Sequence, residues 1–557
     1  MTALQEIKKN ITEEIKKVQE VEITEANFTT PPNPELGDLS LNISFQLAKK
    51  NKSNPKQEAE KLAEKLKNIQ GIEKTRATGP YLNFFLDYSF FSKQVLTQAL
   101  QKNYGSSKKG QGKTILIDYS SVNIAKPMHV GHLRSTIIGD SLHKLLEYNG
   151  FKCHGENYLG DWGLQFGKLL YSYKQWGSEE KLKQDPISHL HELYIKFHEL
   201  ENEELKAKAE EEFSKLEKGD KENKELWKKF RELSLSKFNE VYKKLGVSFD
   251  SFKGESYYSK FNNEVIKETL EKKVAIQEKP GTIIIPLEKY GLTNARLMEN
   301  NRTLYITREI AAAEKRKQEH DFYKALYVVS SAQSLHFQQL KKALELLGHE
   351  WSKDCEHVKF GLFSLPSGKI STRKGNIIHL NDVLDKAVEK ALEIIEEKNP
   401  NLENKKEAAE KIGIGAVKFA DLSQNRIKDV VFDFDKMISF EGDTSPYLQY
   451  AYVRCKSILE KQKGALEKAD FSKITEKEEK QLIKKLAEFP SIIEKSALQY
   501  EPHHLANYLL ELAHLYSSFY EKLKISESNE RLLITEAVAN VLKTGLSLLG
   551  IETIEKM

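Results

Sequence analysis

Cysteine is scarce in this sequence. Cys153, Cys355 and Cys455 are the three cysteines among 557 residues. They are too far apart along the chain for a Cys-x-x-Cys zinc site, and three are too few for a disulfide framework. The sequence therefore predicts no protein-bound structural metal, and its cysteine content is typical of a protein of the reducing cytoplasm.

Long apolar runs and an excess of one charge are missing as well. The sequence has no apolar run of about 18 residues, the length that a membrane-spanning helix needs. Its first residues do not form the apolar core of a secretion signal. Lys and Arg number 86 against 82 Asp and Glu, a formal net charge of +4. We therefore expect a cytoplasmic protein without membrane contact, in which any nucleic-acid site is a local patch.

The most informative feature is a strand followed by a turn and a helix. Residues 113–119 are a short run rich in β-branched side chains, typical of a strand buried in a parallel sheet. From Leu133 onward, apolar residues recur at helical spacing, and Pro127 lies where a helix start tolerates a missing N–H. Residues 120–132 are therefore predicted to join a strand to a helix N-terminus.

Groups that can handle a nucleotide gather in this turn. His129 and His132 are three residues apart and can share one face, and Gly131 lets a ligand approach the backbone. A helix N-terminus attracts phosphate, and imidazoles can donate hydrogen bonds to it. An isolated His-x-Gly-His is usually an ordinary pair of histidines near a cap. Its position where open α/β sheets bind nucleotides, with Asn123 and Lys126 just upstream, favours an ATP site.

A second half of the same sheet is predicted after an insertion. Residues 186–245 form charged helices with a narrow apolar seam, and residues 273–287 form a hairpin. Residues 325–331 are a second buried strand, again followed by a helix. Two strand–helix halves predict a nucleotide-binding sheet with a crevice between them.

A basic loop downstream is a second candidate for phosphate binding. Glycines flank it, and it carries hydroxyl and cationic side chains at Lys369, Ser371, Thr372, Arg373 and Lys374. Such groups can neutralise a triphosphate as a loop closes. A loop of this kind on its own is more often an exposed basic turn. Paired with the histidine turn, it is predicted to form the other half of an ATP clamp.

The predicted fold is a multidomain α/β protein. The strand–helix halves indicate the α/β class, and a length of 557 residues is enough for about three or four domains. We predict a small α+β domain at residues 1–105 and a Rossmann-type parallel-sheet catalytic domain at 112–370, with a helical and hairpin insertion at about 180–290. A connecting helical region over 371–438 leads to an all-helical bundle over 439–557. In the first domain, Tyr81, Phe84 and Phe85 are predicted to be core rather than an RNA-stacking surface.

These motifs resemble those of class I aminoacyl-tRNA synthetases. The His129-Val130-Gly131-His132 element is similar to the HIGH element, and residues 369–373 are similar to the KMSKS loop. Further motifs narrow the resemblance to the arginyl-tRNA synthetases: Ser121-x-Asn123-Ile-Ala-Lys126, Gly160-Asp161-Trp162-Gly163-x-Gln165-Phe166-Gly167 and Ala332-Gln333-Ser-Leu-His336-Phe337. The resemblance covers essentially the whole chain.

The resemblance implies a two-step reaction. L-Arginine and ATP with Mg²⁺ would give arginyl-adenylate and pyrophosphate, and the arginyl group would pass to the 3′-terminal adenosine of tRNA(Arg). It also implies a monomer, a tRNA-contacting N-terminal domain and a C-terminal bundle that binds the anticodon, with Tyr447 and Tyr450 as candidates for base stacking or for burial.

The resemblance further assigns site residues. Those implied in catalysis are Lys126, His129, His132, Lys369 and Arg373. Those implied in ATP binding are His129, Gly131, His132, Ser371, Thr372 and Lys374. Those implied in arginine binding are Ser121, Asn123, His132, Tyr305, Glu309 and Gln333.

Two positions depart from the family pattern. Glu309 stands where the family has Asp, which moves the carboxylate by about a bond length, so the pocket should adjust and still bind the guanidinium. Thr372 stands at a lysine position of the loop, and Lys126 occupies the place of the lysine that, in the family, is thought to substitute for the missing loop cation.

Another class I synthetase or a nucleotidylyltransferase would lack Tyr305, Glu309 and Gln333. A non-catalytic RNA-binding paralogue would more often have lost the histidines or the basic loop.

Overall fold

The computed structural model describes residues 2–557, except 366–367, 370–378, 432 and 440–441. The chain divides into two compact units. The first contains residues 1–106, 450–493 and 508–545, and the second contains residues 107–449, 494–507 and 546–557.

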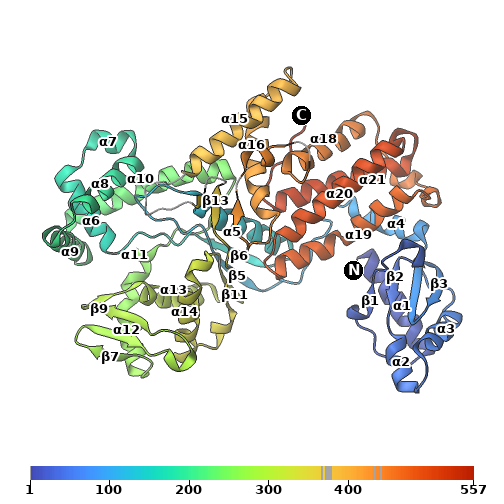
Figure 1. Cartoon of the computed structure of the whole chain (residues 1–557), viewed down its shortest axis with the longest axis horizontal. Helices are drawn as coiled ribbons and strands as arrows, with labels where there is room; N and C mark the ends of the chain where they lie inside the picture. The colour runs from blue at the N-terminus through green and yellow to red at the C-terminus, as the bar shows by residue number, and fades with distance from the viewer. Residues whose placement is uncertain (1, 366–367, 370–378, 432, 440–441) are drawn as a thin grey trace. The chain divides into compact units, whose positions relative to one another are not determined.

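The N-terminal part of the first unit is a four-stranded antiparallel sheet packed with helices (Figure 1). Its strand order is β1-β2-β4-β3, with β1 (Phe28–Thr29), β2 (Leu39–Leu41), β3 (Ile72–Thr78) and β4 (Tyr81–Leu86). Its helices are α1 (Ala3–Val18), α2 (Ser44–Asn51), α3 (Pro55–Lys65) and α4 (Tyr88–Ala99). Phe84 is buried as predicted, but Tyr81 is 44% exposed. The prediction of core is wrong for Tyr81 because it directly follows the hairpin turn at Gly79 and Pro80.

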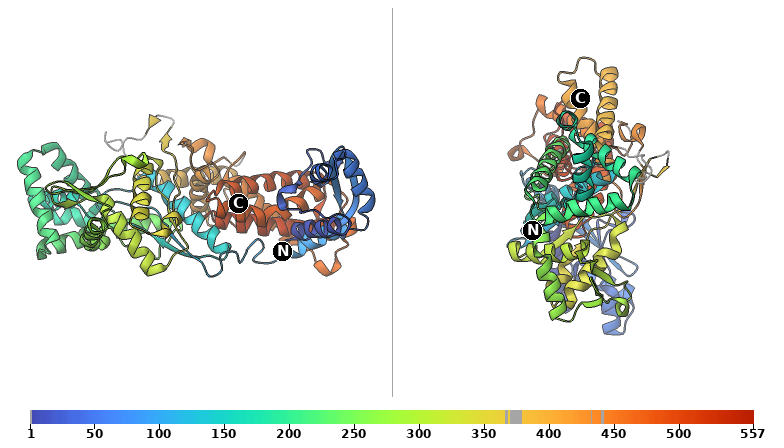
Figure 2. Two further views of the ribbon diagram at one scale, coloured as in Figure 1. Left: turned by 90° about the horizontal axis from the view of Figure 1, so that it is seen from below. Right: turned by 90° about the vertical axis from the view of Figure 1, so that its left-hand side faces the viewer.

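The C-terminal helices form the predicted bundle. They are α18 (Ser445–Lys461), α19 (Lys477–Leu498), α20 (His503–Lys522) and α21 (Asn529–Leu548). The last three run lengthwise beside one another (Figures 1 and 2). The Tyr508 hydroxyl donates to the Lys485 carbonyl, and Arg531 pairs with Glu479 at 2.8 Å. An apolar seam of α20 is buried at Leu505, Leu509, Leu512, Tyr516 and Phe519.

A parallel sheet lies at the centre of the second unit. Its order is β12-β11-β5-β6, with β5 (Thr114–Asp118), β6 (Lys152–Glu156), β11 (Lys324–Tyr327) and β12 (Cys355–His357). Helix α5 (Val130–Tyr148) connects β5 to β6, and α14 (Ser334–Leu346) connects β11 to β12. The two halves meet where β11 pairs with β5, with Tyr327 opposite Asp118. A crevice at the carboxyl ends of these two strands is where such sheets bind ligands.

The insertion contains helices and a second sheet. The helices are α6 (Leu164–Trp176), α7 (Glu179–Gln184), α8 (Pro186–Leu200), α9 (Glu203–Glu217), α10 (Lys221–Leu245), α11 (Glu255–Tyr258) and α12 (Asn262–Glu271). The predicted hairpin is confirmed as β7 (Ile276–Lys279) and β8 (Thr282–Ile285). Two strands that the sequence did not predict, β9 (Ala295–Glu299) and β10 (Arg302–Thr303), complete an antiparallel sheet.

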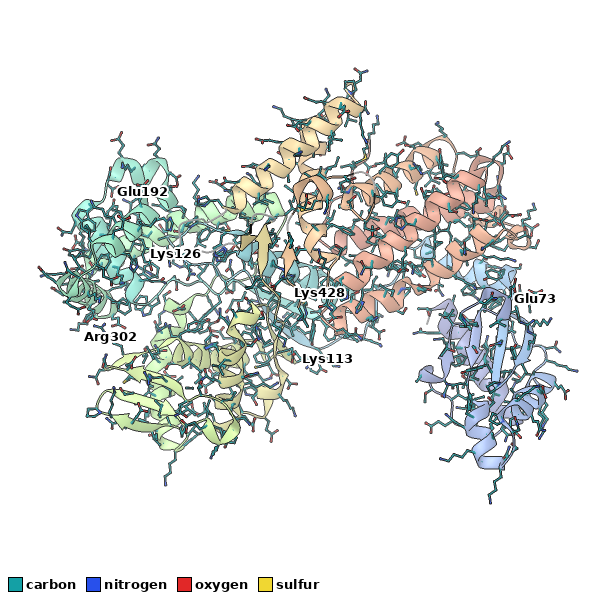
Figure 3. The ribbon with its side chains drawn as sticks, in the orientation of Figure 1. Glu73, Lys113, Lys126, Glu192, Arg302 and Lys428 are labelled. Carbon is teal, nitrogen blue, oxygen red and sulfur yellow. The ribbon has the colours of Figure 1, made fainter. Side chains whose placement is uncertain are left out.

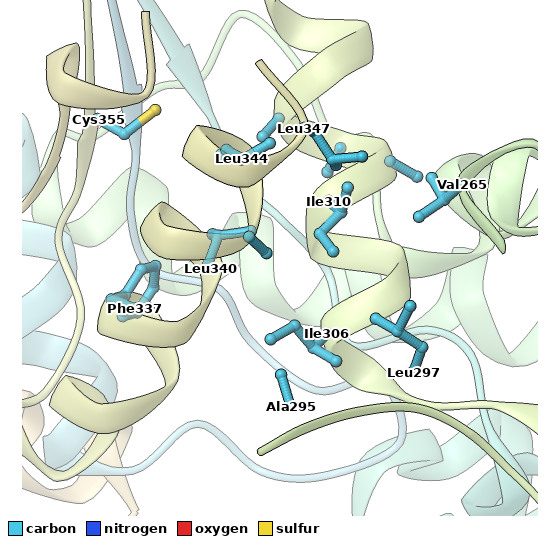
Figure 4. Close-up of a cluster of buried hydrophobic side chains, with 14 of the residues drawn as sticks. Val265, Ala295, Leu297, Ile306, Ile310, Phe337, Leu340, Leu344, Leu347 and Cys355 are labelled. Atoms are coloured by element: carbon cyan, nitrogen blue, oxygen red, sulfur yellow. The ribbon is translucent and has the colours of Figure 1, made fainter. Parts of the chain in front are cut away.

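A hydrophobic core fixes helix α13 (Tyr305–His320) against α14. Ile306 and Ile310 on α13 face Leu340 and Leu344 on α14, as Figure 4 shows. All four side chains are buried. Because close-packed side chains hold a helix rigidly, this core sets the position of the residues at both ends of α13.

The remaining elements of the second unit follow β12. The strands are β13 (Phe363–Leu365), β14 (Gly368–Lys369) and β15 (Val430–Val431), and the helices are α15 (Leu380–Lys398), α16 (Lys405–Leu422) and α17 (Phe434–Met437). Arg134 of α5 is fully buried and pairs with Asp421 of α16 at 2.9 Å. Its guanidinium also donates to the backbone carbonyls of Gly361, Arg426 and Lys428. Arg134 thus ties α5 to the chain on either side of the basic loop.

Candidate active site

The chain leaves β5 through a turn with left-handed backbone. Ser120, Ser121 and Ala125 have φ values of 73°, 49° and 62°. The Ser121 hydroxyl donates to Asp118 at 2.9 Å, and the Ser120 hydroxyl accepts from Thr136 at 2.8 Å. Such backbone strain persists where surrounding contacts fix it, and it is concentrated at functional sites.

Asn123 is held against the neighbouring strand end. It forms a parallel bridge with Gly160, which follows β6. A Cβ atom at position 160 would lie 2.0 Å from the Asn123 side-chain oxygen. Glycine at 160 is therefore what makes room for the Asn123 amide beside the turn.

The two histidines lie at the start of α5, as predicted. His129 is the N-cap, and its Nδ1 accepts the Gly131 N–H at 3.1 Å, while Nδ1 of His132 accepts the His129 N–H at 3.1 Å. The rings stack with centroids 3.9 Å apart. Burial lowers the pKa of both imidazoles, and the neighbouring His129 lowers that of His132 further. Both rings are thus neutral, and because each Nδ1 is an acceptor, each Nε2 carries the proton.

This arrangement changes what the helix start offers to an anion. The Gly131 N–H is bound by His129 Nδ1, and the His132 N–H donates to the His129 carbonyl at 2.8 Å. In this conformation these two groups do not point to a ligand. The donors at the helix start are therefore the two Nε2–H groups, supported by the positive end of the helix dipole.

Lys126 lies toward the insertion rather than toward α5. Its Nζ is 4.5 Å from the ring centroid of Tyr194 on α8, and burial lowers its pKa. Figure 3 labels Lys126 on the turn and Glu192 on α8. A cation–π contact of this kind holds an ammonium group in place without neutralising it.

Most of the predicted basic loop lies outside the described residues. This applies to Ser371, Thr372, Arg373 and Lys374, and for Lys369 the structure gives only the backbone, in β14. The chain that follows the loop meets the histidine turn. His379 forms an antiparallel bridge with His129, and the Leu380 N–H donates to the Met128 carbonyl at 2.9 Å.

Tyr305 and Glu309, four residues apart, share one face at the start of α13. Glu309 is 2% exposed, and the Tyr305 hydroxyl hydrogen-bonds to it. The Tyr305 ring stacks on His336 of α14 with centroids 4.7 Å apart. Gln333 lies just before α14 with an exposed side chain. The structure therefore brings Tyr305 and Glu309 together, and it places Gln333 in the segment between β11 and α14.

The surroundings of Glu309 carry an excess of carboxyl groups. Arg316 pairs with Asp118 at 2.8 Å and Glu156 at 2.6 Å, and Arg308 pairs with Glu255 at 2.7 Å. Together with Glu309, four carboxyl groups thus face two guanidinium groups. A buried environment of this composition favours one more cation.

Burial dominates the titration of these carboxyl groups. It raises the pKa of Asp118 to about 6 and that of Glu255 to about 7, in each case against the opposing effect of its arginine partner. Burial also raises the pKa of Glu309. The buried Tyr158 hydroxyl, which feels the charges of Glu309 and Glu255, has no hydrogen-bond partner among the described residues. This cluster can therefore accept one more positively charged group and one more hydrogen bond, at the Tyr158 hydroxyl.

The residues of this cluster that the sequence analysis did not single out are Asp118, Glu156, Glu255, Arg308 and Arg316. Arg316 lies in a charged stretch in which Glu, Lys and Arg are typical of solvent-facing helix residues. No local pattern distinguishes them, because their burial depends on which distant segments cover them.

The candidate anticodon residues lie on α18. Tyr450 is 41% exposed, and the Arg454 guanidinium lies 4.7 Å from its ring centroid and from that of Tyr520. Tyr447 is half-buried, and its N–H donates to the Thr444 hydroxyl.

Within the described residues, no helix combines the length and apolar character that crossing a membrane requires.

Three family models match the chain. Residues 94–434 match the catalytic domain of tRNA synthetases class I (R). Residues 448–557 match the DALR anticodon binding domain, and residues 5–86 match the arginyl tRNA synthetase N terminal domain.

The chain is also similar to individual proteins over nearly its whole length. It is 46% identical over 548 residues to an arginine–tRNA ligase of Halothermothrix orenii, covering 96% of both chains. It is 44% identical to one of Clostridium botulinum, covering 97% of both. The solved Thermus thermophilus arginyl-tRNA synthetase superposes with a TM-score of 0.82 at 25% identity, over 99% of this chain and 100% of that one. The Plasmodium falciparum arginyl-tRNA synthetase shares the fold, with a TM-score of 0.81 at 24% identity, covering 100% of both chains.

Proposed function

The chain belongs to the arginyl-tRNA synthetases of class I, and we propose that the crevice at the carboxyl ends of β5 and β11 is its active site. The family's reaction is arginine–tRNA ligation: ATP, L-arginine and tRNA(Arg) give arginyl-tRNA(Arg), AMP and diphosphate. The protein is thus a ligase, and the proposal concerns which of its residues carry out each part of the reaction.

The buried negative cluster around Glu309 is the observation that supports this site. A carboxylate can accept the guanidinium fork of arginine in two parallel hydrogen bonds, whereas lysine offers only a point charge. Tyr305 holds the Glu309 carboxyl in place, and the surrounding carboxyl groups supply the field that favours a cation. We assign the arginine side chain to this cluster, with Ser121, Asn123, His132 and Gln333 bordering the substrate's backbone end.

ATP, as its Mg²⁺ complex, is assigned to the histidine turn. In the first step a carboxylate oxygen of arginine attacks the α-phosphorus, and the bond to the bridging oxygen of pyrophosphate breaks. Negative charge builds on the phosphate oxygens, and the Nε2–H groups of His129 and His132 are placed to donate to them. Because both rings are neutral, they stabilise this charge as hydrogen-bond donors rather than as cations.

The cations are assigned to Lys126 and the basic loop. Lys369 and Arg373 would neutralise the triphosphate, and Ser371, Thr372 and Lys374 would bind it. Gly131 leaves room for the His129 ring, because a Cβ atom at this position would lie 2.8 Å from that ring. Lys126 supplies the charge that Thr372 does not. No covalent enzyme intermediate is needed, so positioning and charge stabilisation account for the rate.

The tRNA is assigned to two further parts of the chain. Residues 439–557 would bind the anticodon through Tyr447 and Tyr450, and residues 1–105 would contact the tRNA elsewhere. In the second step a hydroxyl of the 3′-terminal adenosine attacks the arginyl carbonyl and AMP leaves. We further propose that the enzyme works as a monomer in the cytoplasm.

Pyrophosphate exchange tests the proposed site. The wild-type protein should exchange pyrophosphate into ATP with arginine and not with lysine, in assays run with and without tRNA. Glu309→Gln keeps the side-chain size but removes the charge, so it should abolish most of the exchange. Glu309→Asp restores the usual family residue and should retain activity.

Exchange with lysine, or none at all with tRNA present, would contradict the function. Near-normal activity of Glu309→Gln would remove Glu309 from the site and leave the function standing.

A further inference from the structure

We propose that His154, Glu156 and His320 form a binding site for one divalent transition-metal ion of the Zn²⁺ type. His154 and Glu156 lie on β6, and His320 is the last residue of α13. One ligand atom of each residue lies within 4.8 Å of the others. Two imidazoles and a carboxylate are the donors that zinc takes in sites that keep a further position for water.

The two imidazoles have nitrogen atoms that the fold leaves unused. The rings lie against each other with centroids 4.0 Å apart. Nε2 of His154 and Nε2 of His320 are both buried, and neither has a hydrogen-bond partner among the described residues. Buried side-chain nitrogens are normally satisfied, so two of them side by side call for a shared ligand.

Glu156 is held in place for a ligand role. Its Oε1 accepts from Arg316 at 2.7 Å and from the Tyr258 hydroxyl at 2.9 Å, whereas the bond from Ser251 to Oε2 is longer, at 3.3 Å. Oε2 therefore keeps lone pairs available. Metal-ligating carboxylates are typically oriented by such outer hydrogen bonds.

Local charge is compatible with a cation. The positive charges of Arg316 and Lys253 disfavour a cation beside the two histidines. The negative charges of Asp250, Glu156 and Glu319 favour one. His320 also ends α13, where the helix dipole is negative and favours positive charge.

Two other His and Glu clusters among the described residues lack this arrangement. In the cluster of Glu268, Glu314 and His349, His349 Nε2 lies 2.8 Å from Glu314. In the cluster of Glu501, His503 and His504, His504 Nε2 lies 3.0 Å from Glu501. His349 and His504 thus each have a carboxylate within hydrogen-bond distance. The pair at His154 and His320 differs because, in the described part of the chain, neither Nε2 has a hydrogen-bond partner and the nearest acid of the ion pairs, Glu319, lies 3.8 Å from His320 Nε2.

A metal there would tie β6 to the end of α13. The other end of α13 carries Tyr305 and Glu309, so the ion would brace the helix that presents them. Glu156 is shared with the carboxyl groups around Glu309, whereas His154 and His320 are assigned to neither ATP nor arginine, and metal binding does not depend on the ligase reaction.

Cobalt binding to the full-length, untagged, metal-stripped protein tests the proposal. We expect one equivalent of Co²⁺ to give visible ligand-field bands, which one equivalent of Zn²⁺ abolishes, and Zn²⁺ to raise the melting temperature. His154→Asn and His320→Asn should each weaken Co²⁺ binding by at least about tenfold. His349→Asn, a change in the paired cluster, should bind Co²⁺ as the wild type does.

Two results would overturn the site. One is a wild-type protein with no saturable Co²⁺ spectrum, and the other is equal Co²⁺ binding by wild type, His154→Asn and His320→Asn. Circular dichroism melting of each variant without metal shows whether the variant is folded. If a folded variant gives the wild-type Co²⁺ spectrum, the mutated residue is not a metal ligand.

Discussion

The carboxyl groups around Glu309 show how strongly burial sets the behaviour of single residues. Glu255 and Asp118 each have an arginine partner, which alone would lower their pKa values. Burial outweighs the partner in both cases and raises the pKa to about 7 and about 6. Desolvation of a carboxylate can exceed the attraction of one ion pair, which explains the direction. A second guanidinium, that of the substrate, would shift the balance back.

Arginine binding should therefore release protons near neutral pH. Folded-state pKa values raised above the usual range mean that these groups are partly protonated below pH of about 7. The bound guanidinium favours the charged form, so arginine affinity should rise with pH up to about 7, by about tenfold per pH unit for one released proton, and level off above it. The free energy of unfolding of the free protein should fall as pH rises from about 4 to about 7, because over this range the folded protein holds protons that the unfolded chain has released.

Calorimetry measures this release directly. Binding heats of arginine in two buffers with different ionisation enthalpies should differ at pH 7 and converge at pH values well above 8. Glu255→Gln should reduce the difference. Identical heats in both buffers at pH 7 would contradict the assignment of arginine to this cluster.

Lys126 should contribute to adenylate formation. Removing one group that stabilises developing phosphate charge typically costs about 10² to 10³ in kcat, and Lys126→Ala is expected to fall in this range. Pyrophosphate exchange and the melting temperature should be measured together, because the lysine role predicts lost activity in a folded protein. Tyr194→Phe keeps the ring face and should be near normal, whereas Tyr194→Leu removes it and should lower kcat. Normal exchange by Lys126→Ala would exclude the role.

At the scale of elements, two helices carry the site. Helix α5 begins at the histidines, and Arg134 within it fastens the helix to residues 361 and 426–428 and to α16. Helix α13 begins at Tyr305 and ends at His320, so it connects the arginine cluster with the proposed metal site. Apolar spacing predicted α5. The contacts of Arg134 with distant segments, and the position of His320 beside β6, were not predicted.

Arg134→Ala should be strongly destabilising. The Arg134–Asp421 pair is fully buried, and removing one partner of such a pair costs about 3–5 kcal/mol because a charge is left unpaired. Chemical denaturation followed by fluorescence gives the free energy of unfolding. Arg296→Ala is the control, because the Arg296–Glu299 pair is exposed and should cost no more than about 1 kcal/mol. Equal effects of the two changes would show that Arg134 does not anchor α5.

Some strands escaped prediction for a physical reason. β5 and β11 are buried central strands, so their sequences are apolar runs. β6 lies at the edge of the sheet and contains Lys152, His154 and Glu156, whose polarity hides the strand. β9 and β10 were missed because β10 is two residues long and follows the turn at Asn300 and Asn301.

At the scale of the whole molecule, the proposed functions belong to residues far apart in the chain. The histidine turn, the Glu309 cluster, the proposed metal site and Tyr447 lie in the second unit, and Tyr450 lies in the first. Mutation of Tyr450 should therefore separate recognition of the anticodon from chemistry on arginine and ATP.

Tyr450→Ala should weaken tRNA use without affecting catalysis at saturation. Stacking of one base on an aromatic ring contributes about 1–3 kcal/mol, so the KM for tRNA(Arg) should rise by about tenfold or more at an unchanged kcat. Aminoacylation at varied tRNA concentration measures both constants. Tyr290→Ala is a matched control, because Tyr290 is 40% exposed but belongs to the catalytic insertion. An unchanged KM in Tyr450→Ala would reject its stacking role.

The sequence by itself determined the strand, turn and helix that carry His129 and His132, the pairing of Tyr305 with Glu309 on one helix face, and the family. These features depend on the spacing of residues that are close together in the chain, and this spacing can be seen in the sequence. Only the tertiary structure decided the tautomers of the histidines, the raised pKa values around Glu309 and the meeting of His154 with His320. Desolvation and Coulomb energies depend on distances through space. Those distances are set by segments that lie far apart in the chain, so no local pattern records them.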